Sequence, residues 1–248
     1  MATILTYHHI GDVPADYPER NLCVSPAHFD AQMGFLHRKG WSVVSLDMVR
    51  RELLGEIRLP AHAVAITFDD GTRSVLMHAI PILKRYGFSA TVFVVTNQVQ
   101  AQSGGTAPHD QFAPLTRDEL MMLSREGLTI GSHSQTHRRL TELSADECEQ
   151  EVAGSKRSLE CILGEPVHWF SYPYGSFNFQ IIESVRRAGY HGAASVIRDN
   201  RNSAKHLFCL QRVMVMQDTT LTRFRYYFSQ LYHYIHKCKN QRRWKPYV

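Results

Sequence analysis

Short apolar runs that are typical of buried strands alternate with helix-like segments along most of this 248-residue chain. The predicted strands cover residues 3–8, 41–46, 63–66, 90–95, 128–130, 169–172 and 191–196. When helices connect strands in this way, the strands run parallel, and polar side chains gather at their carboxyl ends. The alternation therefore predicts an α/β fold, a single-domain parallel barrel with its site at the C-terminal rim.

Capping residues mark the helices between these strands. Ser25 and Pro26 fit the N-cap and first position of one helix, and Asp47 is expected to cap a short helix that ends at residue 54. Further helices are predicted at residues 75–86, 116–124, 144–163 and 181–188. Residues 97–114 interrupt the alternation, either as a rim loop that shapes a binding site or as a merely mobile loop.

The basic character of the chain resides in its C-terminal tail. The net charge is +5, but residues 220–248 carry seven Lys and Arg residues and no acid, so removing this +7 leaves −2 for the rest. The main part of the chain therefore gives no support for nucleic-acid binding, and the tail lacks a recognised nucleic-acid motif.

Apolar side chains recur at helical spacing in this tail. They are Phe224, Phe228, Leu231 and Ile235. We therefore expect a basic C-terminal helix and tail (217–248) after a barrel domain (1–216). The helix either docks on the barrel or lies on an anionic membrane surface, where it would bring the protein to lipid-linked sugars.

Two further features bear on the compartment. The longest apolar runs are shorter than the roughly 18 residues of a membrane span, and residues 1–4 lack the basic and apolar regions of a secretion signal. Five cysteines are scattered without a CxxC pattern, so neither a disulfide framework nor a thiolate metal site is expected. The expected location is the cytoplasm, with peripheral contact at the inner membrane surface as an option for the tail.

Asp69 and Asp70 follow the apolar run 63–66 and precede Gly71. Adjacent residues of an extended segment point to opposite sides, so the two carboxylates can serve two roles, one holding a metal ion and one handling protons. The same Asp-Asp-Gly sequence also fits a plain turn with a helix cap.

Two histidines four residues apart, His133 and His137, follow the apolar stretch at 128–130. If this segment turns helical, both rings can face one ion. Together with Asp70 they would supply three ligands and leave a fourth position open, which is the pattern of catalytic zinc sites. Zinc is the expected ion, although cobalt, nickel and iron accept such ligands as well.

Three short motifs occur in the order found in the polysaccharide deacetylases, also known as NodB-homology proteins or family 4 carbohydrate esterases. They are TFDDG at 67–71, HSQTH at 133–137 and FSYPYG at 170–175. The chain resembles this family over residues 3–216. The resemblance implies a distorted parallel (β/α)7 barrel and a metal-dependent hydrolase that deacetylates N-acetylated saccharides.

The resemblance also implies roles for single residues. Asp70, His133 and His137 would bind the divalent metal ion, and Asp69 would be the general base. Tyr174 would offer its backbone N–H to the developing oxyanion. The third motif as a whole would contribute the substrate-binding residues Tyr172, Pro173, Tyr174 and Gly175.

Two departures from the family pattern concern the groups around the catalytic aspartate. The third motif usually carries an arginine two residues before its proline, which orients that aspartate, and here Ser171 stands in its place. Arg212 is a candidate replacement from a later strand. A plain surface arginine is the alternative.

The second departure is that the apolar-apolar-His segment, which normally supplies the family's general acid near the C-terminus, is absent after Gly175. A similar segment ends in His8 near the N-terminus. The first and last strands of a closed barrel are neighbours, so a circularly permuted chain can place His8 where that acid belongs. The resemblance is then to permuted members that act on poly-N-acetylglucosamine. His9 is expected to have no catalytic role, and a structural role for His8 is the alternative.

The sequence thus predicts a metal-dependent deacetylase of an N-acetylhexosamine-containing saccharide, in surface or exopolysaccharide biosynthesis. Cleavage of an O-acetyl ester or a non-sugar amide fits the same residues. A carbohydrate-binding protein without activity also fits, if Ser171 leaves the catalytic aspartate misoriented.

Overall fold

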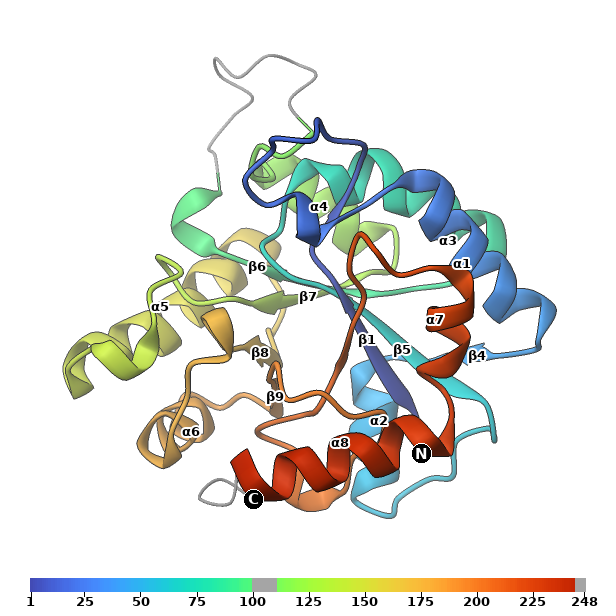
Figure 1. The fold of residues 1–248 in the computed structure, drawn as a ribbon. Helices are drawn as coiled ribbons and strands as arrows, with labels where there is room; N and C mark the ends of the chain where they lie inside the picture. The colour runs from blue at the N-terminus through green and yellow to red at the C-terminus, as the bar shows by residue number, and fades with distance from the viewer. Residues whose placement is uncertain (100–110, 244–248) are drawn as a thin grey trace.

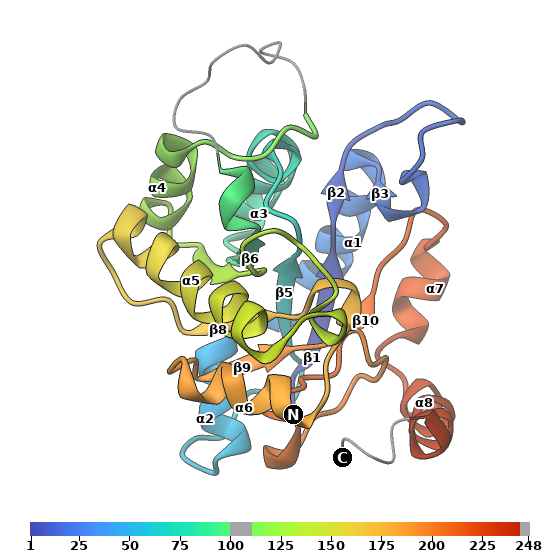
Figure 2. The same cartoon turned by 90° about the vertical axis from the view of Figure 1, so that its left-hand side faces the viewer.

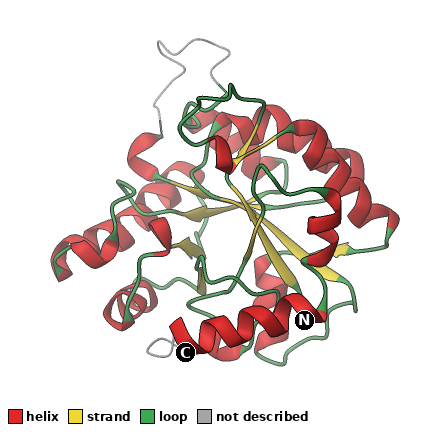
Figure 3. Cartoon of the chain, in the orientation of Figure 1, coloured by secondary structure: helices red, strands yellow, loops and turns green. Residues whose placement is uncertain are grey.

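The computed structural model of the chain describes residues 1–99 and 111–243. Within them the strands lie inside a layer of helices (Figures 1 and 3). The interruption predicted at residues 97–114 begins with a 3-10 turn at Thr96–Gln98, and most of the rest of it lies outside the described residues.

One curled parallel sheet has eight strands in the described residues, and seven of them follow one another in the order β10-β1-β5-β6-β7-β8-β9. Their bounds are β1 (Thr3–Tyr7), β5 (Ala63–Phe68), β6 (Thr91–Val94), β7 (Thr129–Ser132), β8 (Trp169–Ser171), β9 (Gly192–Ala194) and β10 (Val213–Met214). The segment before β10 closes the sheet against β9, because the Leu210 N–H donates to the Ala193 carbonyl (2.8 Å) and the Ser195 N–H donates to the Leu210 carbonyl (2.9 Å). The expected distorted barrel is therefore confirmed.

The described part of the chain also contains three short strands, eight α-helices, and several short 3-10 and π turns. The strands β2 (His9–Ile10) and β3 (Cys23–Val24) pair with each other, and β4 (Ser42–Val43) pairs with β5. The helices are α1 (Pro26–Arg38), α2 (Leu46–Leu53), α3 (Ile80–Tyr86), α4 (Arg117–Arg125), α5 (Ala145–Leu163), α6 (Phe179–Arg187), α7 (Leu221–Tyr226) and α8 (Gln230–Arg243). None of these helices has the length and apolarity to cross a membrane.

Both faces of the strands are buried, as expected for a parallel sheet covered by helices. On β5, one set of alternate residues packs in the large cluster that reaches the helices, and the other set packs with Phe93 and Trp169 in a smaller cluster inside the barrel. Ala63 and Ala65 belong to the inner set. Asp69 continues their register, so the strand aims it into the barrel.

The start of α2 corrects one prediction. Ser45, not Asp47, caps this helix, because its side chain accepts a hydrogen bond from the Met48 N–H (3.2 Å). Asp47 lies in the first turn instead. The strand expected at 41–46 is shorter in the structure and covers only Ser42–Val43, because the chain leaves the sheet before Ser45 caps α2.

The tail forms two helices rather than one (Figure 2). The break follows from two side chains: Asn200 donates to the carbonyls of Tyr227 (2.8 Å) and Ser229 (3.0 Å), and Ser229 Oγ accepts from the Tyr232 N–H (3.1 Å) at the start of α8. Phe224 of α7 is fully buried in the large cluster. The tail therefore packs on the barrel.

Candidate active site

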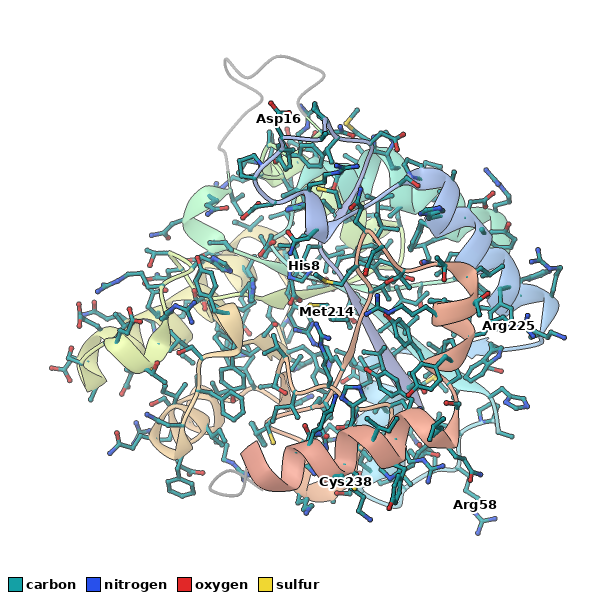
Figure 4. The ribbon with its side chains drawn as sticks, in the orientation of Figure 1. His8, Asp16, Arg58, Met214, Arg225 and Cys238 are labelled. Carbon is teal, nitrogen blue, oxygen red and sulfur yellow. The ribbon has the colours of Figure 1, made fainter. Side chains whose placement is uncertain are left out.

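The carboxyl ends of several barrel strands surround one cavity of about 460 Å³. Its lining includes His8 after β1, Asp69 and Asp70 after β5, and His133 and His137 after β7. Figure 4 shows His8 near the centre of the barrel. Residues from distant parts of the sequence thus meet at the C-terminal rim.

Asp69 and Asp70 point in different directions because the chain leaves β5 between them. The Asp69 N–H donates to the Tyr7 carbonyl of β1 (2.9 Å), so Asp69 keeps the register of the strand. Asp70 has a left-handed backbone (φ 71°), and Gly71 follows with φ 67°. This turn brings the Asp70 carboxylate toward the two histidines.

His133 and His137 face each other although the segment that carries them does not turn helical. The segment that carries them is a loop after β7, in which Ser134 and His137 have left-handed backbones (φ 64° and 61°). Ser134 Oγ accepts a hydrogen bond from the His137 N–H (3.1 Å). The fold of the loop, rather than helical spacing, brings the rings together.

Glu151 of α5 holds this loop in place. Its Oε2 accepts hydrogen bonds from the N–H groups of Gln135 (2.8 Å) and Thr136 (2.9 Å), and the residue is only 5% exposed. The sequence analysis assigned Glu151 no role. The signal that could have revealed it is an acid on the buried face of an amphipathic helix.

The three predicted metal ligands form one cluster. The Nε2 atoms of His133 and His137 lie 3.2 Å apart, and each lies 3.5 Å from Asp70 Oδ1. His133 Nδ1 lies 2.8 Å from the Ser171 carbonyl, which can only accept, so Nδ1 carries the proton. The lone pair of His133 Nε2 is therefore free to face the other two ligands.

The charges of the cluster suit a divalent cation. Burial lowers the pKa of His133 to about 3 and also lowers the pKa of His137, so both rings are neutral at pH 7. Burial, together with the charges of Asp69 and Glu19, raises the pKa of Asp70 to about 7. The cluster thus offers two neutral imidazoles and one carboxyl group, which is the donor set of a metal site. A bound cation would favour the ionised form of Asp70.

Arg212 is buried, 1% exposed, and forms a forked ion pair with Asp69. Its Nη1 lies 2.8 Å from Asp69 Oδ1, and its Nη2 lies 2.7 Å from Oδ2. The other three N–H groups donate to Thr67 Oγ1 (3.2 Å), Ser171 Oγ (3.1 Å) and the Ser195 carbonyl (2.9 Å). All five donors of the guanidinium are used, so the alternative of a plain surface arginine is excluded.

Two opposed effects set the pKa of Asp69. Burial alone would raise this pKa, but the Arg212 guanidinium, with smaller contributions from His133 and His8, holds it well below the usual range. Asp69 is therefore a carboxylate throughout the neutral and mildly acidic range.

His8 directly follows β1, the first strand, which pairs with β5 on one side and with the last strand, β10, on the other. Its Nδ1 is buried and has no hydrogen-bond partner among the described residues. Burial lowers the pKa of His8 to about 4 and outweighs the opposite effect of Asp69, so the ring is neutral at pH 7. A buried polar atom without a partner is uncommon and suits a group that meets its partner only when a ligand binds.

The third motif forms a tight turn after β8 that presents Tyr174 to the cavity. Tyr174 is 54% exposed, has a left-handed φ of 56°, and its ring centroid lies 4.6 Å from that of His137. The Tyr172 ring is buried, and its hydroxyl donates to a backbone carbonyl (2.8 Å). Pro173 and Gly175 are buried and lie outside the lining of this cavity, so they shape the turn.

His9 and Glu19 also line the cavity, although the sequence analysis gave neither a role. His9 Nε2 lies 3.9 Å from Asp70 Oδ2 and 3.6 Å from Glu19 Oε2, and its Nδ1 lies 3.2 Å from Thr72 Oγ1. Glu19 comes from the loop between β2 and β3, where no motif marks it.

Comparison with known families now decides the identity of this site. The family model described as polysaccharide deacetylase matches residues 56–193, which is more than half of the chain. This chain belongs to the polysaccharide deacetylase family. The predicted family is confirmed, and its members are hydrolases.

Individual relatives of this deacetylase agree with the family model. The chain is 26% identical to YxkH of Bacillus subtilis, named as a polysaccharide deacetylase, over 86% of this chain and 70% of that protein. It is 24% identical to the poly-beta-1,6-N-acetyl-D-glucosamine N-deacetylase of Escherichia coli K12, over 89% of this chain but only 37% of that enzyme. The structure of the Streptococcus pyogenes deacetylase PplD in complex with acetate matches with a TM-score of 0.83 and 25% identity, over 92% of this chain and 98% of that one.

Arg212, just before β10, binds the aspartate that the family pattern pairs with an arginine at position 171. Ser171 occupies the usual arginine position and is fully buried. Its Oγ lies 3.5 Å from both carboxylate oxygens of Asp69 and accepts a hydrogen bond from Arg212. The small serine leaves the space that the guanidinium fills.

Proposed function

We propose that this polysaccharide deacetylase is a metal-dependent hydrolase that removes N-acetyl groups from an N-acetylhexosamine-containing saccharide in surface or exopolysaccharide biosynthesis. The observation that carries the proposal is the meeting of a three-ligand cluster, centred on Asp70, with the Asp69–Arg212 pair in one cavity. The poly-N-acetylglucosamine specificity in the name of the E. coli relative supports the substrate class.

The metal would be held by Asp70, His133 and His137, and we propose zinc, with cobalt, nickel and iron fitting the same ligands. When bound, such an ion polarises a substrate carbonyl and lowers the pKa of water that it coordinates to about 7. The neutral rings of His133 and His137 keep their lone pairs available for it at pH 7.

Asp69 is a carboxylate that the ligand cluster does not use, so it is free to accept the proton of the attacking water. Arg212 positions it by binding both oxygens, which fixes the plane of the carboxylate. The same pairing lowers the pKa of Asp69 and makes it a weaker base. Its contribution to proton transfer therefore depends on how the carboxylate is placed in the cavity.

His8 would donate the proton that the leaving amine takes up, and Tyr174 would offer its backbone N–H to the oxyanion. The ring of His8 is neutral in the free protein at pH 7. It therefore has to gain its proton during the reaction, and the neighbouring charge of Asp69 favours that protonated form.

The proposal is tested by acetate release from N-acetylglucosamine oligomers. We expect release by the metal-loaded protein and none after chelation, with recovery when metal is restored. His8→Ala is expected to lower turnover by about 10²–10⁴-fold, because it removes the proton donor. Near-normal turnover of this variant would make His8 a structural residue, and release that survives chelation would contradict the metal-dependent reaction.

The competing proposal of a silent carbohydrate-binding protein rested on Ser171. The forked contact of Arg212 with Asp69 removes this reason, because the carboxylate is held in place without the usual arginine. An O-acetyl ester or a non-sugar amide is the other candidate substrate, and acetate release from such compounds in the same assay separates it from the N-acetyl sugar.

We also propose that α8 holds the enzyme at the cytoplasmic face of the inner membrane. Its outer side exposes Leu231 (58%) and Tyr234 (66%) beside Lys237, which suits an anionic lipid surface. The full chain is expected to sediment with anionic liposomes, and Leu231→Ser/Tyr234→Ser is expected to lower its recovery in the pellet. Equal recovery of the two proteins would remove α8 from membrane binding.

A further inference from the structure

A second cavity, of about 560 Å³, adjoins the active site. The two cavities share Tyr174, Val196 and Met214 as a common wall. Figure 4 shows Met214 close to His8 in the middle of the molecule. Because the ring of Tyr174 packs on His137, a group in the second cavity is separated from the metal ligands by about the width of one side chain.

The other wall of this cavity is basic. It is formed by His236, Lys239 and Asn240 of α8, and by Arg198 from the segment after β9. No Asp or Glu is among the described residues that line it. Within residues 1–99 and 111–243, neither Arg198 nor Lys239 forms an ion pair, so both charges are available to a ligand.

Several hydrogen bonds fix α8 against this wall. Asn240 donates to the Arg198 carbonyl (3.1 Å) and to Gln211 Oε1 (3.1 Å). About two turns closer to the start of the helix, His233 Nδ1 lies 2.8 Å from Asp199 Oδ1. The helix is thus held on both sides of His236, and the cavity is formed before any ligand binds.

The titration of His236 reflects the positive surroundings. Burial lowers the pKa of this imidazole, the charges of Lys239 and Arg198 lower it further, and Asp199 acts in the opposite direction. The Asp199 carboxylate is already paired with His233. The charged side chains that line the cavity among the described residues, Arg198 and Lys239, are both positive, which suits an anionic ligand.

We propose that this second cavity binds an acidic group, a carboxylate or a phosphate, on the saccharide unit next to the one that loses its acetyl group. Arg198 and Lys239 contact the acid, and Tyr174 separates it from the metal ligands. The inference rests on the proposed function, and it makes an acidic saccharide a better substrate than a matched neutral one. An exposed arginine and lysine are screened by salt, so the contribution is moderate and depends on ionic strength.

The test compares the kcat/KM of acetate release by the metal-loaded full chain for matched acidic and neutral substrates. One pair is N-acetylglucosamine linked to glucuronic acid or to glucose, and the other is N-acetylglucosamine linked to glucose 6-phosphate or to glucose. We expect kcat/KM for the acidic member of one pair to exceed that for the neutral member by about tenfold, which is about 1.4 kcal/mol. The pair that shows the preference tells carboxylate from phosphate, and the preference should fall in about 0.5 M salt.

The charge-removing variant is Arg198→Gln/Lys239→Gln, which should abolish the preference. The matched control is Arg58→Gln/Arg157→Gln, which removes two exposed charges that line neither cavity, and it should keep the preference. Figure 4 shows Arg58 at the edge of the molecule, away from His8. A wild type without preference, or a charge-removing variant that retains it, overturns the inference.

Binding separates this inference from the proposed function. If no substrate releases acetate, the proposed hydrolase fails, and calorimetry of the deacetylated acidic and neutral compounds then decides the inference. Tighter binding of the acidic compound that is lost in Arg198→Gln/Lys239→Gln supports the second cavity as an anion site. Equal affinities of the wild type for both compounds overturn it.

Discussion

Replacing Arg212 by alanine is expected to lower the free energy of unfolding by about 3–5 kcal/mol. The change leaves the Asp69 carboxylate buried without a counter-charge, and it leaves the Ser195 carbonyl without its donor. Breaking one side of a buried pair has a larger effect than losing a surface pair, because the remaining charge cannot reach water. Urea denaturation at pH 7 measures the loss.

The loss should shrink as the pH falls from about 7 toward 4, and it should shrink further below about 4. In the wild type the pKa of Asp69 lies below its usual range, so the stability that the pair contributes is present above the ordinary value and declines as acid protonates the folded state. In the variant, burial without Arg212 raises the pKa of Asp69, so acid relieves the buried charge. A difference that stays constant from about pH 7 to 3.5 would assign the loss to packing instead.

Arg212→Lys is the matched control, because it keeps the charge but cannot form the planar fork. We expect its unfolding free energy to lie between those of the wild type and the alanine variant. If lysine and alanine destabilise equally, the geometry of the guanidinium, and not its charge, supports Asp69.

The barrel and the ligand cluster could be predicted because local signals determine both. Apolar runs of strand length determine which residues enter the sheet, and parallel connections place the carboxyl end of every strand on one rim. Asp70 and the two histidines each follow such a run. Strand order therefore places all three on one rim, and the fold of the loop after β7 then brings the two rings together.

The loop around His133 could not be predicted in the same way. Its shape depends on left-handed residues, Ser134 among them, and on Glu151, which reaches it from the following helix. The spacing of the two histidines indicated that they act together, but a loop and not a helical turn brings their rings together. Long-range contacts also decided the tail, where Asn200 interrupts a run that by periodicity alone reads as one helix.

The positions of Arg212 and His8 lie between these two cases. Each residue was a candidate because this chain lacks, at its usual position, a group that the family pattern requires. The sequence alone could not show whether the side chain of Arg212 or His8 lies in the site. The pairing of β1 with β10 and the forked contact with Asp69 supply that information. Barrel closure is a property of the whole chain, and no local pattern encodes it.

Asp69→Asn is expected to lower the kcat of acetate release by about 10²–10⁴-fold while the metal content stays unchanged. Asp69 is outside the ligand cluster, so an amide there removes the proton acceptor but leaves Asp70, His133 and His137 intact. Metal analysis of the purified variant, beside steady-state kinetics, separates the two effects. A variant that loses its metal would instead place Asp69 among the ligands.

The control for this substitution is Ser171→Ala. Ser171 touches the same carboxylate only at 3.5 Å and accepts one of the five bonds of Arg212, so its loss should change kcat by less than about tenfold. A large loss for Asp69→Asn beside a small one for Ser171→Ala would mean that the carboxylate acts chemically and that Arg212 alone suffices to hold it. Activity of Asp69→Asn within about tenfold of the wild type would mean that another group accepts the proton. His8 Nδ1, which has no hydrogen-bond partner in the described part of the chain, is the candidate that the cavity offers.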